Sequence, residues 1–226
     1  MEGGGFFDYE QRTVSATLRY ELSRRLRSGL RYGHAAIPTP EERPEAESTS
    51  HAAHLVLEGD ILPRVQGELA VGYLSQTNPN VLEEGRRYRG LSLQGSLRRD
   101  LAPASWLRLS LNRTTYPSAY EANGFYVTTA GLAELTVPLP FYVSLRGGVG
   151  YHRNSYRVAT ASLGEPRQDR ILTWSVGLGR SVTRRAFLRA DYVRDRRDSN
   201  LDAFDRTSSS FVIQLGVSAT EGSGGR

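Results

Sequence analysis

Hydrophobic and polar residues alternate with a period of two along most of the chain. In residues 14–22, valine, alanine, leucine and tyrosine occupy the even positions, and serine, threonine, arginine and glutamate occupy the odd ones. Successive side chains of a β-strand point to opposite faces of its sheet, so this pattern predicts a strand with one apolar and one polar face. The pattern recurs down the chain and predicts eleven strands.

The predicted strands are joined by connections that alternate between short and long. Five short turns fall at residues 23–25, 62–64, 102–105, 138–140 and 183–185, and the longer segments include residues 35–50, 75–86, 157–169 and 195–206. The strands run for about ten residues, the length needed to cross hydrocarbon at a tilt. This layout predicts an all-β fold, an antiparallel up-and-down transmembrane β-barrel with about 11–12 strands in this chain. These strands can also be part of a larger barrel.

We expect one barrel domain over residues 1–226, with a ragged start at 1–10 and a flexible Gly/Ser tail at 220–226. The composition is 38% hydrophobic and 23% charged, and no stretch approaches the roughly 18–20 apolar residues of a membrane helix. A soluble sandwich or lipocalin-like barrel is the competing interpretation. Strand length together with the alternation of turns and loops favours the membrane barrel.

Charge and cysteine content exclude several kinds of chemistry. The chain has 29 basic and 24 acidic residues, and every basic residue is arginine. Without lysine there is no P-loop lysine and no Schiff base. Without cysteine there is neither a disulfide scaffold nor a cysteine zinc site. The arginines are interleaved with acids rather than gathered in one stripe, so we expect no nucleic-acid partner.

Charged residues of both signs fall on the polar side of the predicted strands. These lumen-facing candidates are Arg19, Glu21, Arg27, Arg31, Glu58, Glu68, Arg108, Glu134, Arg146, Arg189 and Asp191. Such a face fits a hydrated lumen crossed by ion pairs. It equally fits cross-strand pairs that brace a narrow, closed interior.

Aromatic residues fall on the apolar side and predict contact with the lipid bilayer. The membrane-interface candidates are Tyr20, Tyr32, Tyr73, Phe141, Tyr151, Trp174 and Tyr192. Tyr20 and Phe141 lie beside short turns and the others lie toward the long loops, so two aromatic bands are expected at the two interfaces.

No catalytic, cofactor or metal site emerges from the sequence. His51 and His54 are three residues apart and point to opposite faces of a strand. His152 and Ser155 are close only in sequence, which does not give the geometry of a hydrolase. The acids of residues 195–205 could hold Ca²⁺, but interleaved arginines favour solvated ion pairs. We therefore expect a protein that is not an enzyme.

The amino terminus carries no signal peptide, since it has neither a basic start nor an apolar segment. The first predicted strand also runs toward a short turn, which suggests a missing partner strand upstream. We therefore expect an amino-terminally incomplete piece of a barrel with twelve or more strands. Alternatively, residues 3–9 supply a stub of strand in a complete small barrel.

The last predicted hairpin reads YVRDRRDSN at residues 192–200 and FDRTSSSF at residues 204–211. It resembles the carboxy-terminal hairpin of the β-barrel porin type 2 family of Gram-negative outer membranes, in which a tyrosine-containing strand passes through a Ser-Asn loop into the final strand. The resemblance implies a larger barrel, of which this chain is the carboxy-terminal part. It also implies that some members act with polysaccharide-export machinery.

These observations lead to one main functional hypothesis and two competitors. The first is an outer-membrane conduit or export component for small solutes or polysaccharide, with periplasmic or outer-membrane export proteins as partners. The second is a closed structural or adhesin-type barrel that works through its extracellular loops. The third, an outer-membrane hydrolase, would need a serine, a histidine and an acid converging at the outer rim, and the sequence has no such signature.

Overall fold

The computed structural model describes residues 10–38, 44–81, 83–118, 123–159, 164–182 and 186–217. In these ranges no helix is long and apolar enough to cross a membrane. The helix α1 spans Glu83–Arg86, and the 3-10 turns η1 and η2 span Pro44–Ala46 and Asp202–Phe204. The strands are β1 (Arg12–Ser23), β2 (Leu26–Ile37), β3 (Ser48–Leu62), β4 (Val65–Thr77), β5 (Arg87–Ala102), β6 (Ser105–Pro117), β7 (Phe125–Leu139), β8 (Val143–Ala159), β9 (Pro166–Ser181), β10 (Ala186–Ser199) and β11 (Arg206–Val217).

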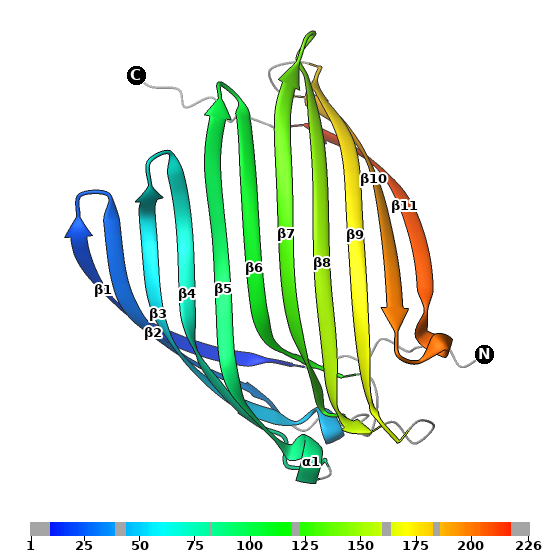
Figure 1. The fold of residues 1–226 in the computed structure, drawn as a ribbon. Coiled ribbons are helices and arrows are strands. Elements are labelled where there is room, and N and C mark those ends of the chain that lie inside the picture. Colours follow the sequence, from blue (N-terminus) through cyan, green and yellow to red (C-terminus); the bar gives the residue numbers. More distant parts are fainter. Residues whose placement is uncertain are drawn as a thin grey trace.

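All the strands belong to one 11-stranded sheet in which neighbours in sequence are neighbours in space. Every adjacent pair is antiparallel, from β1 with β2 to β10 with β11. Figure 1 shows a strongly curved sheet, with the tight turns at the top of the view and α1 at the bottom. The predicted antiparallel up-and-down architecture is confirmed.

The described residues do not close this sheet into a barrel. β1 pairs only with β2, and β11 pairs only with β10. Direction reverses at each step along the sheet, so the first and the eleventh strand run the same way. Antiparallel pairing cannot join two such edges, because it needs an even number of strands. The closure expected from the sequence is therefore absent from the described part of the chain.

The register assigns each strand residue to one of two faces, because directly opposed residues of neighbouring strands point the same way. Arg27 is opposed to Glu58 and Glu58 to Glu68, while Arg108 is opposed to Glu134. We call the face that carries these side chains the polar face and its opposite the apolar face. The alternation predicted from the sequence persists across all the strands.

The apolar face is widely exposed. Leu18, Leu55 and Leu215 lie on it, and 74, 68 and 72% of their surfaces are accessible. Contiguous exposed apolar surface of this kind marks an interaction site or contact with lipid.

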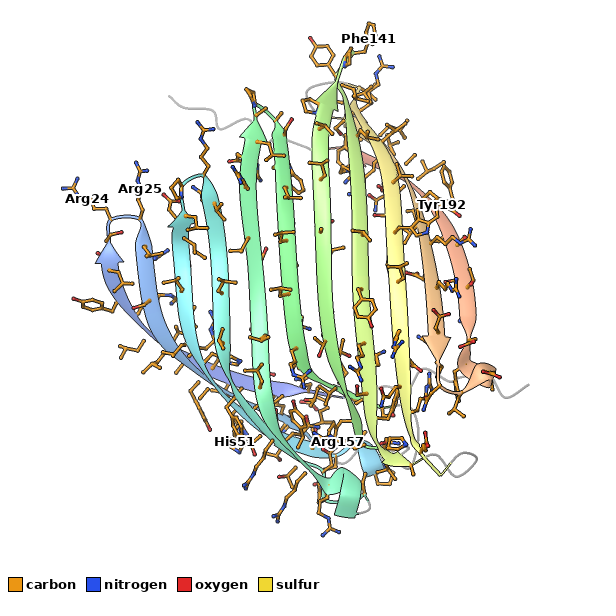
Figure 2. The ribbon with its side chains drawn as sticks, in the orientation of Figure 1. Arg24, Arg25, His51, Phe141, Arg157 and Tyr192 are labelled. Carbon is orange, nitrogen blue, oxygen red and sulfur yellow. The ribbon has the colours of Figure 1, made fainter. Side chains whose placement is uncertain are left out.

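The turn between β7 and β8 differs from its prediction. Residues 138–140 were expected to form it, with Phe141 beginning the next strand on the apolar face. Instead β7 continues through Leu139, and the amide of Val143 donates to the Pro140 carbonyl at 3.4 Å. Phe141 and Tyr142 have φ of 62° and 59°, the left-handed pair whose twist suits a tight hairpin. Phe141 therefore stands at the tip of the turn (Figure 2).

The long connections are shorter than predicted, because the strands extend into them. Residues 35–37 and 48–50 pair in the ladder between β2 and β3, within the segment predicted as a loop at 35–50. The predicted loop at 195–206 likewise loses residues 195–199 to β10 and its last residue to β11. The segments 75–86 and 157–169 are shortened at their strand ends in the same way.

The buried core lies where β5 and β6 separate. Their ladder ends at the pair Leu93 and Arg113 on the loop side. Beyond it Leu74 of β4, Tyr88 of β5, and Phe125 with Val127 of β7 form a buried apolar cluster. The Tyr88 and Phe125 rings meet edge to face at 5.9 Å. This cluster holds the loop ends of β4 and β5 against those of the second half of the sheet.

Gly59 provides a test of the β2–β3–β4 register. Its φ is 120°, and a Cβ there would lie 2.1 Å from the Arg25 carbonyl oxygen, whereas a Cβ at Gly33 would meet nothing within 4 Å. We expect G59A to lower the free energy of unfolding by about 1–3 kcal/mol through backbone strain. The control G33A should change it by less than about 1 kcal/mol. Urea titration of the folded chain in detergent measures both values, and equal losses would contradict this account.

Candidate functional site

The eleven charged residues predicted to face a lumen all lie on the polar face. The register places there Arg19, Glu21, Arg27, Arg31, Glu58, Glu68, Arg108, Glu134, Arg146, Arg189 and Asp191. That a water-filled lumen borders this face stays a prediction.

A first group of these side chains joins β1 to β4. The Glu58 carboxylate accepts from Nε of Arg19 at 3.2 Å and from Nη2 of Arg27 at 2.9 Å. Nη1 of Arg31 donates to Glu68 at 2.8 Å. These side chains are partly exposed, so each pair contributes about 0–1 kcal/mol. The pairs orient charges along the face more than they stabilise the fold.

A second group joins β8 to β10 across β9. Asp191 accepts from Nη2 of Arg146 at 3.1 Å and from Nε of Arg189. In register, Gly177 of β9 lies between Arg146 and Asp191, and a Cβ there would lie 2.0 Å from Oδ1 of Asp191. Glycine therefore leaves the space through which this ion pair crosses a strand. The sequence signal that could have indicated this ion pair was a glycine at a polar-face position of one strand, with charged residues at polar-face positions of the two neighbouring strands.

Glu21, Arg108 and Glu134 form no ion pair within the described ranges, although Glu21 is opposed to Arg27 and Glu134 to Arg108. The Arg108 guanidinium instead lies 5.1 Å from the centre of the Trp106 ring, and that of Arg98 lies 5.2 Å from it. Sequence reasoning missed Trp106. Its parity with Arg108 along the strand was the signal that could have placed it on the polar face.

Six of the seven predicted interface aromatics lie on the apolar face. The register places there Tyr20, Tyr32, Tyr73, Tyr151, Trp174 and Tyr192. The rings of Trp174 and Tyr192 lie 5.3 Å apart, and the Tyr32 hydroxyl hydrogen-bonds Nδ1 of His51 at 2.7 Å. The seventh, Phe141, belongs to the turn described above. Their contact with lipid stays a prediction.

The residues considered for chemistry do not come together. His51 lies on the apolar face and His54 on the polar face, where its Nε2 meets the Ser92 hydroxyl at 2.9 Å. Alternation along β8 places His152 and Ser155 on opposite faces. Asp195 accepts from Thr173, whereas Asp198 pairs with Arg196 at 3.0 Å. In the part of the chain that the structure describes, no group of three or more metal-binding side chains exists.

The polar face is hollowed over β6 to β9. A cavity of about 480 Å³ is lined by Asn112, Tyr116, Thr128, His152 and Asn154, among others. A neighbouring hollow of about 390 Å³ extends it to Thr173, Asp195 and Ser208. The lining mixes hydroxyl and amide groups with apolar side chains such as Leu132 and Ile171, and Arg197 borders both hollows.

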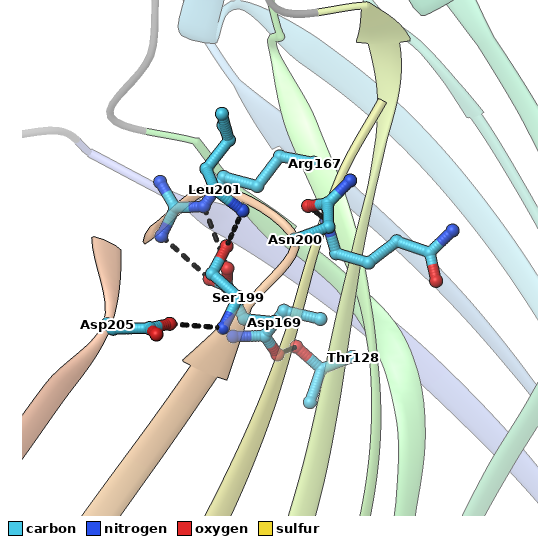
Figure 3. A network of polar contacts seen from close by, with 9 residues as sticks. Thr128, Arg167, Asp169, Ser199, Asn200, Leu201 and Asp205 are labelled. Atoms are coloured by element: carbon cyan, nitrogen blue, oxygen red, sulfur yellow. Dashed lines mark hydrogen bonds and ion pairs between the residues drawn. The ribbon is translucent and has the colours of Figure 1, made fainter. Parts of the chain in front are cut away.

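A buried ion pair anchors the connection between β10 and β11. Arg167 donates to both Asp169 oxygens at 2.8 and 2.7 Å, and the two residues are 3 and 0% exposed. The Arg167 guanidinium lies 3.6 Å from the centre of the Phe204 ring in η2. Asn200 adds bonds to the Gln168 amide at 2.8 Å and the Pro166 carbonyl at 3.1 Å (Figure 3).

Stacked tyrosines continue this anchor across the sheet. The ring of Tyr126 stacks on the ring of Tyr116 at 6.0 Å and on that of Tyr156 at 5.2 Å, measured between ring centres. The Arg167 guanidinium lies 4.9 Å from the centre of the Tyr156 ring. Their ring faces contact each other, so they brace the loop ends of β6 to β9. Sequence reasoning missed the Arg167–Asp169 pair, because it assigned residues 157–169 to a loop. The signal was an arginine and an aspartate two residues apart.

Comparison with known proteins yields one match. Residues 57–220 match the family described as Putative beta-barrel porin 2. No match was found among curated proteins or among solved structures. The matched range begins within β3 and extends past the end of β11, so it covers more than half of the chain. The resemblance inferred from residues 192–211 is confirmed, and the chain belongs to the Putative beta-barrel porin 2 family.

Proposed function

We propose that this chain works as a porin-like conduit of the bacterial outer membrane and not as an enzyme. The observation that supports this most directly is the division of the sheet into two faces. One carries exposed leucine, isoleucine, valine and aromatic side chains, and the other carries ion pairs, hydroxyls and amides. Lipid on one side and water on the other is the environment that such a sheet satisfies.

The strand lengths support a membrane location. The strands run from 12 residues in β1 to 17 in β8, and a tilted strand needs about 9–11 residues to cross hydrocarbon. The extra residues extend the ladder beyond the apolar band, the middle part of the strands in which one face is apolar. Beyond this band both faces are polar. The sheet is therefore long enough to cross the bilayer and to project from it.

The polar face suits passage of hydrophilic solutes. Between the charged pairs of β1–β4 and those of β8–β10 lies a hollow whose polar groups include the amides of Asn112 and Asn154 and the hydroxyl of Thr128. Such groups replace the hydrogen bonds that water makes with a polar solute. We propose small hydrophilic solutes as the first candidates, and polysaccharide, moved together with periplasmic or outer-membrane export proteins, as the second.

The proposal predicts ion conduction. The full chain is folded in detergent and added to a planar lipid bilayer. It should produce discrete conductance steps, because water along the polar face would let ions cross the membrane. The same preparation unfolded by heat is the control. Complete silence from the folded chain, despite verified insertion, would count against an open conduit.

Asp191 allows a test of which face the permeating ions meet. Asp191→Asn leaves Arg146 and Arg189 without their carboxylate, so the polar face becomes more positive. We expect the permeability ratio of chloride to potassium to rise severalfold. Asp198→Asn on the apolar face of the same strand is the matched control and should leave the ratio unchanged. Reversal potentials in a salt gradient measure the permeability ratio of both variants. A shift in the control alone would mean that the permeating ions meet the apolar face, contrary to this proposal.

The second candidate, a closed barrel that acts through its loops, is favoured by the ordered connection in Figure 3. Asp169→Asn would leave Arg167 buried without its carboxylate, a change that costs about 3–5 kcal/mol in buried pairs. We expect trypsin to cleave the variant faster near Arg206, whereas Asp202→Asn, which keeps the ion pair, should match the wild type. Unchanged cleavage of D169N would mean that the ion pair does not hold this connection.

A further inference from the structure

The charged residues on the two faces of the sheet are distributed differently. The polar face carries arginines and carboxylates in similar numbers, and many of them form ion pairs. On the apolar face of the described strands, the register places many arginines and one carboxylate, Asp198. Where this face meets lipid headgroups, their phosphate groups can supply the opposite charge.

Most of these arginines lie toward the loop end of the strands, whereas Arg99 and Arg180 lie near the short turns. We call six of those at the loop end the arginine band: Arg89, Arg113, Arg153, Arg170, Arg194 and Arg196. Arg153 follows Tyr151 at the next position on that face, and Arg194 follows Tyr192 in the same way. One such step along a strand is about 7 Å. The band therefore begins at the level of the aromatic residues, where Arg194 is opposed to Trp174, and continues beyond them at the depth expected of lipid headgroups.

Among the residues that the structure describes, most of the band has no carboxylate partner. Arg196 pairs with Asp198 at 3.0 Å, and Arg153 donates to the neutral Gln168 at 2.9 Å. Arg170 and Arg194 form no ion pair within the described ranges, and both are exposed. Arg153 and Arg170 are directly opposed on β8 and β9, and an anion between them would relieve the repulsion of their like charges.

From this geometry we infer that the arginine band binds the phosphate groups of anionic lipids in the leaflet at the loop end of the barrel. This inference rests on the membrane location proposed above. Guanidinium groups bind phosphate through paired hydrogen bonds and keep their charge at all physiological pH values. Basic side chains at a membrane surface each add attraction to anionic headgroups. The ligand would thus supply the negative charge that the apolar face lacks.

The test compares two sets of variants at the same end of the strands. R153Q/R170Q/R194Q removes charge from the band, and R197Q/R206Q removes it from the polar face of β10 and β11. The full chain in detergent is mixed with bisphosphorylated lipid A or with the same lipid after phosphate removal, and retained lipid is measured by native mass spectrometry. We expect the wild type and the R197Q/R206Q control to retain the phosphorylated lipid preferentially, and the band variant to retain on the order of tenfold less.

Equal retention by the band variant, or equal retention of the dephosphorylated lipid by the wild type, would overturn the inference. Displacement of the lipid by an equimolar amount of inorganic phosphate would also overturn it, because the site would then bind a small anion rather than a lipid. R153K/R170K/R194K, which keeps the charge, should recover part of the retention, and this checks that R153Q/R170Q/R194Q did not act by unfolding.

Conductance of the same variants separates this inference from the proposed function. A wild-type chain that conducts but shows no preference for phosphorylated lipid would defeat the lipid site alone. A chain that retains phosphorylated lipid and never conducts would defeat the conduit alone.

Discussion

The two-residue period of the paired strand is the constraint on which the rest of this structure depends. The inner strands satisfy their backbone donors and acceptors through their neighbours on both sides, and the register of that pairing decides the face on which every side chain lies. If the register of β9 shifted by one residue, Trp174 would move to the face that carries Asp191, and charged residues of β9 would move to the apolar face. The apolar band, the ion pairs and the arginine band all follow from the same register.

The need for backbone pairing also determines what the two open edges require. A bilayer tolerates no unpaired strand edge, because each unsatisfied amide or carbonyl costs several kcal/mol. β1 and β11 have free edges in the described part of the chain and run in the same direction. A single further antiparallel strand would satisfy both edges, which is why even strand numbers are the rule in bacterial barrels. Pore width and closure are thus properties of the strand number.

Periodicity predicted the strands well where their two faces differ. It located all eleven strands and the face of each charged candidate, because in the middle of the strands apolar residues predominate on one face and polar residues on the other. It failed at the loop ends, for example at residues 195–199, because both faces are polar beyond the band and the alternation disappears although the ladder continues. Phe141 was misplaced for a different reason, since a pair of left-handed residues moved the turn.

The sequence by itself determined which residues form strands, which of their faces is apolar and which residues carry the charges, since these depend on neighbours one or two positions away. Only the tertiary structure decided which charges meet. Arg146 reaches Asp191 over Gly177, and Arg167 is buried beneath Phe204, through register and curvature that join strands and connections distant in sequence. Local alternation contains no information about those distances, because any register with the same parity would preserve the two faces.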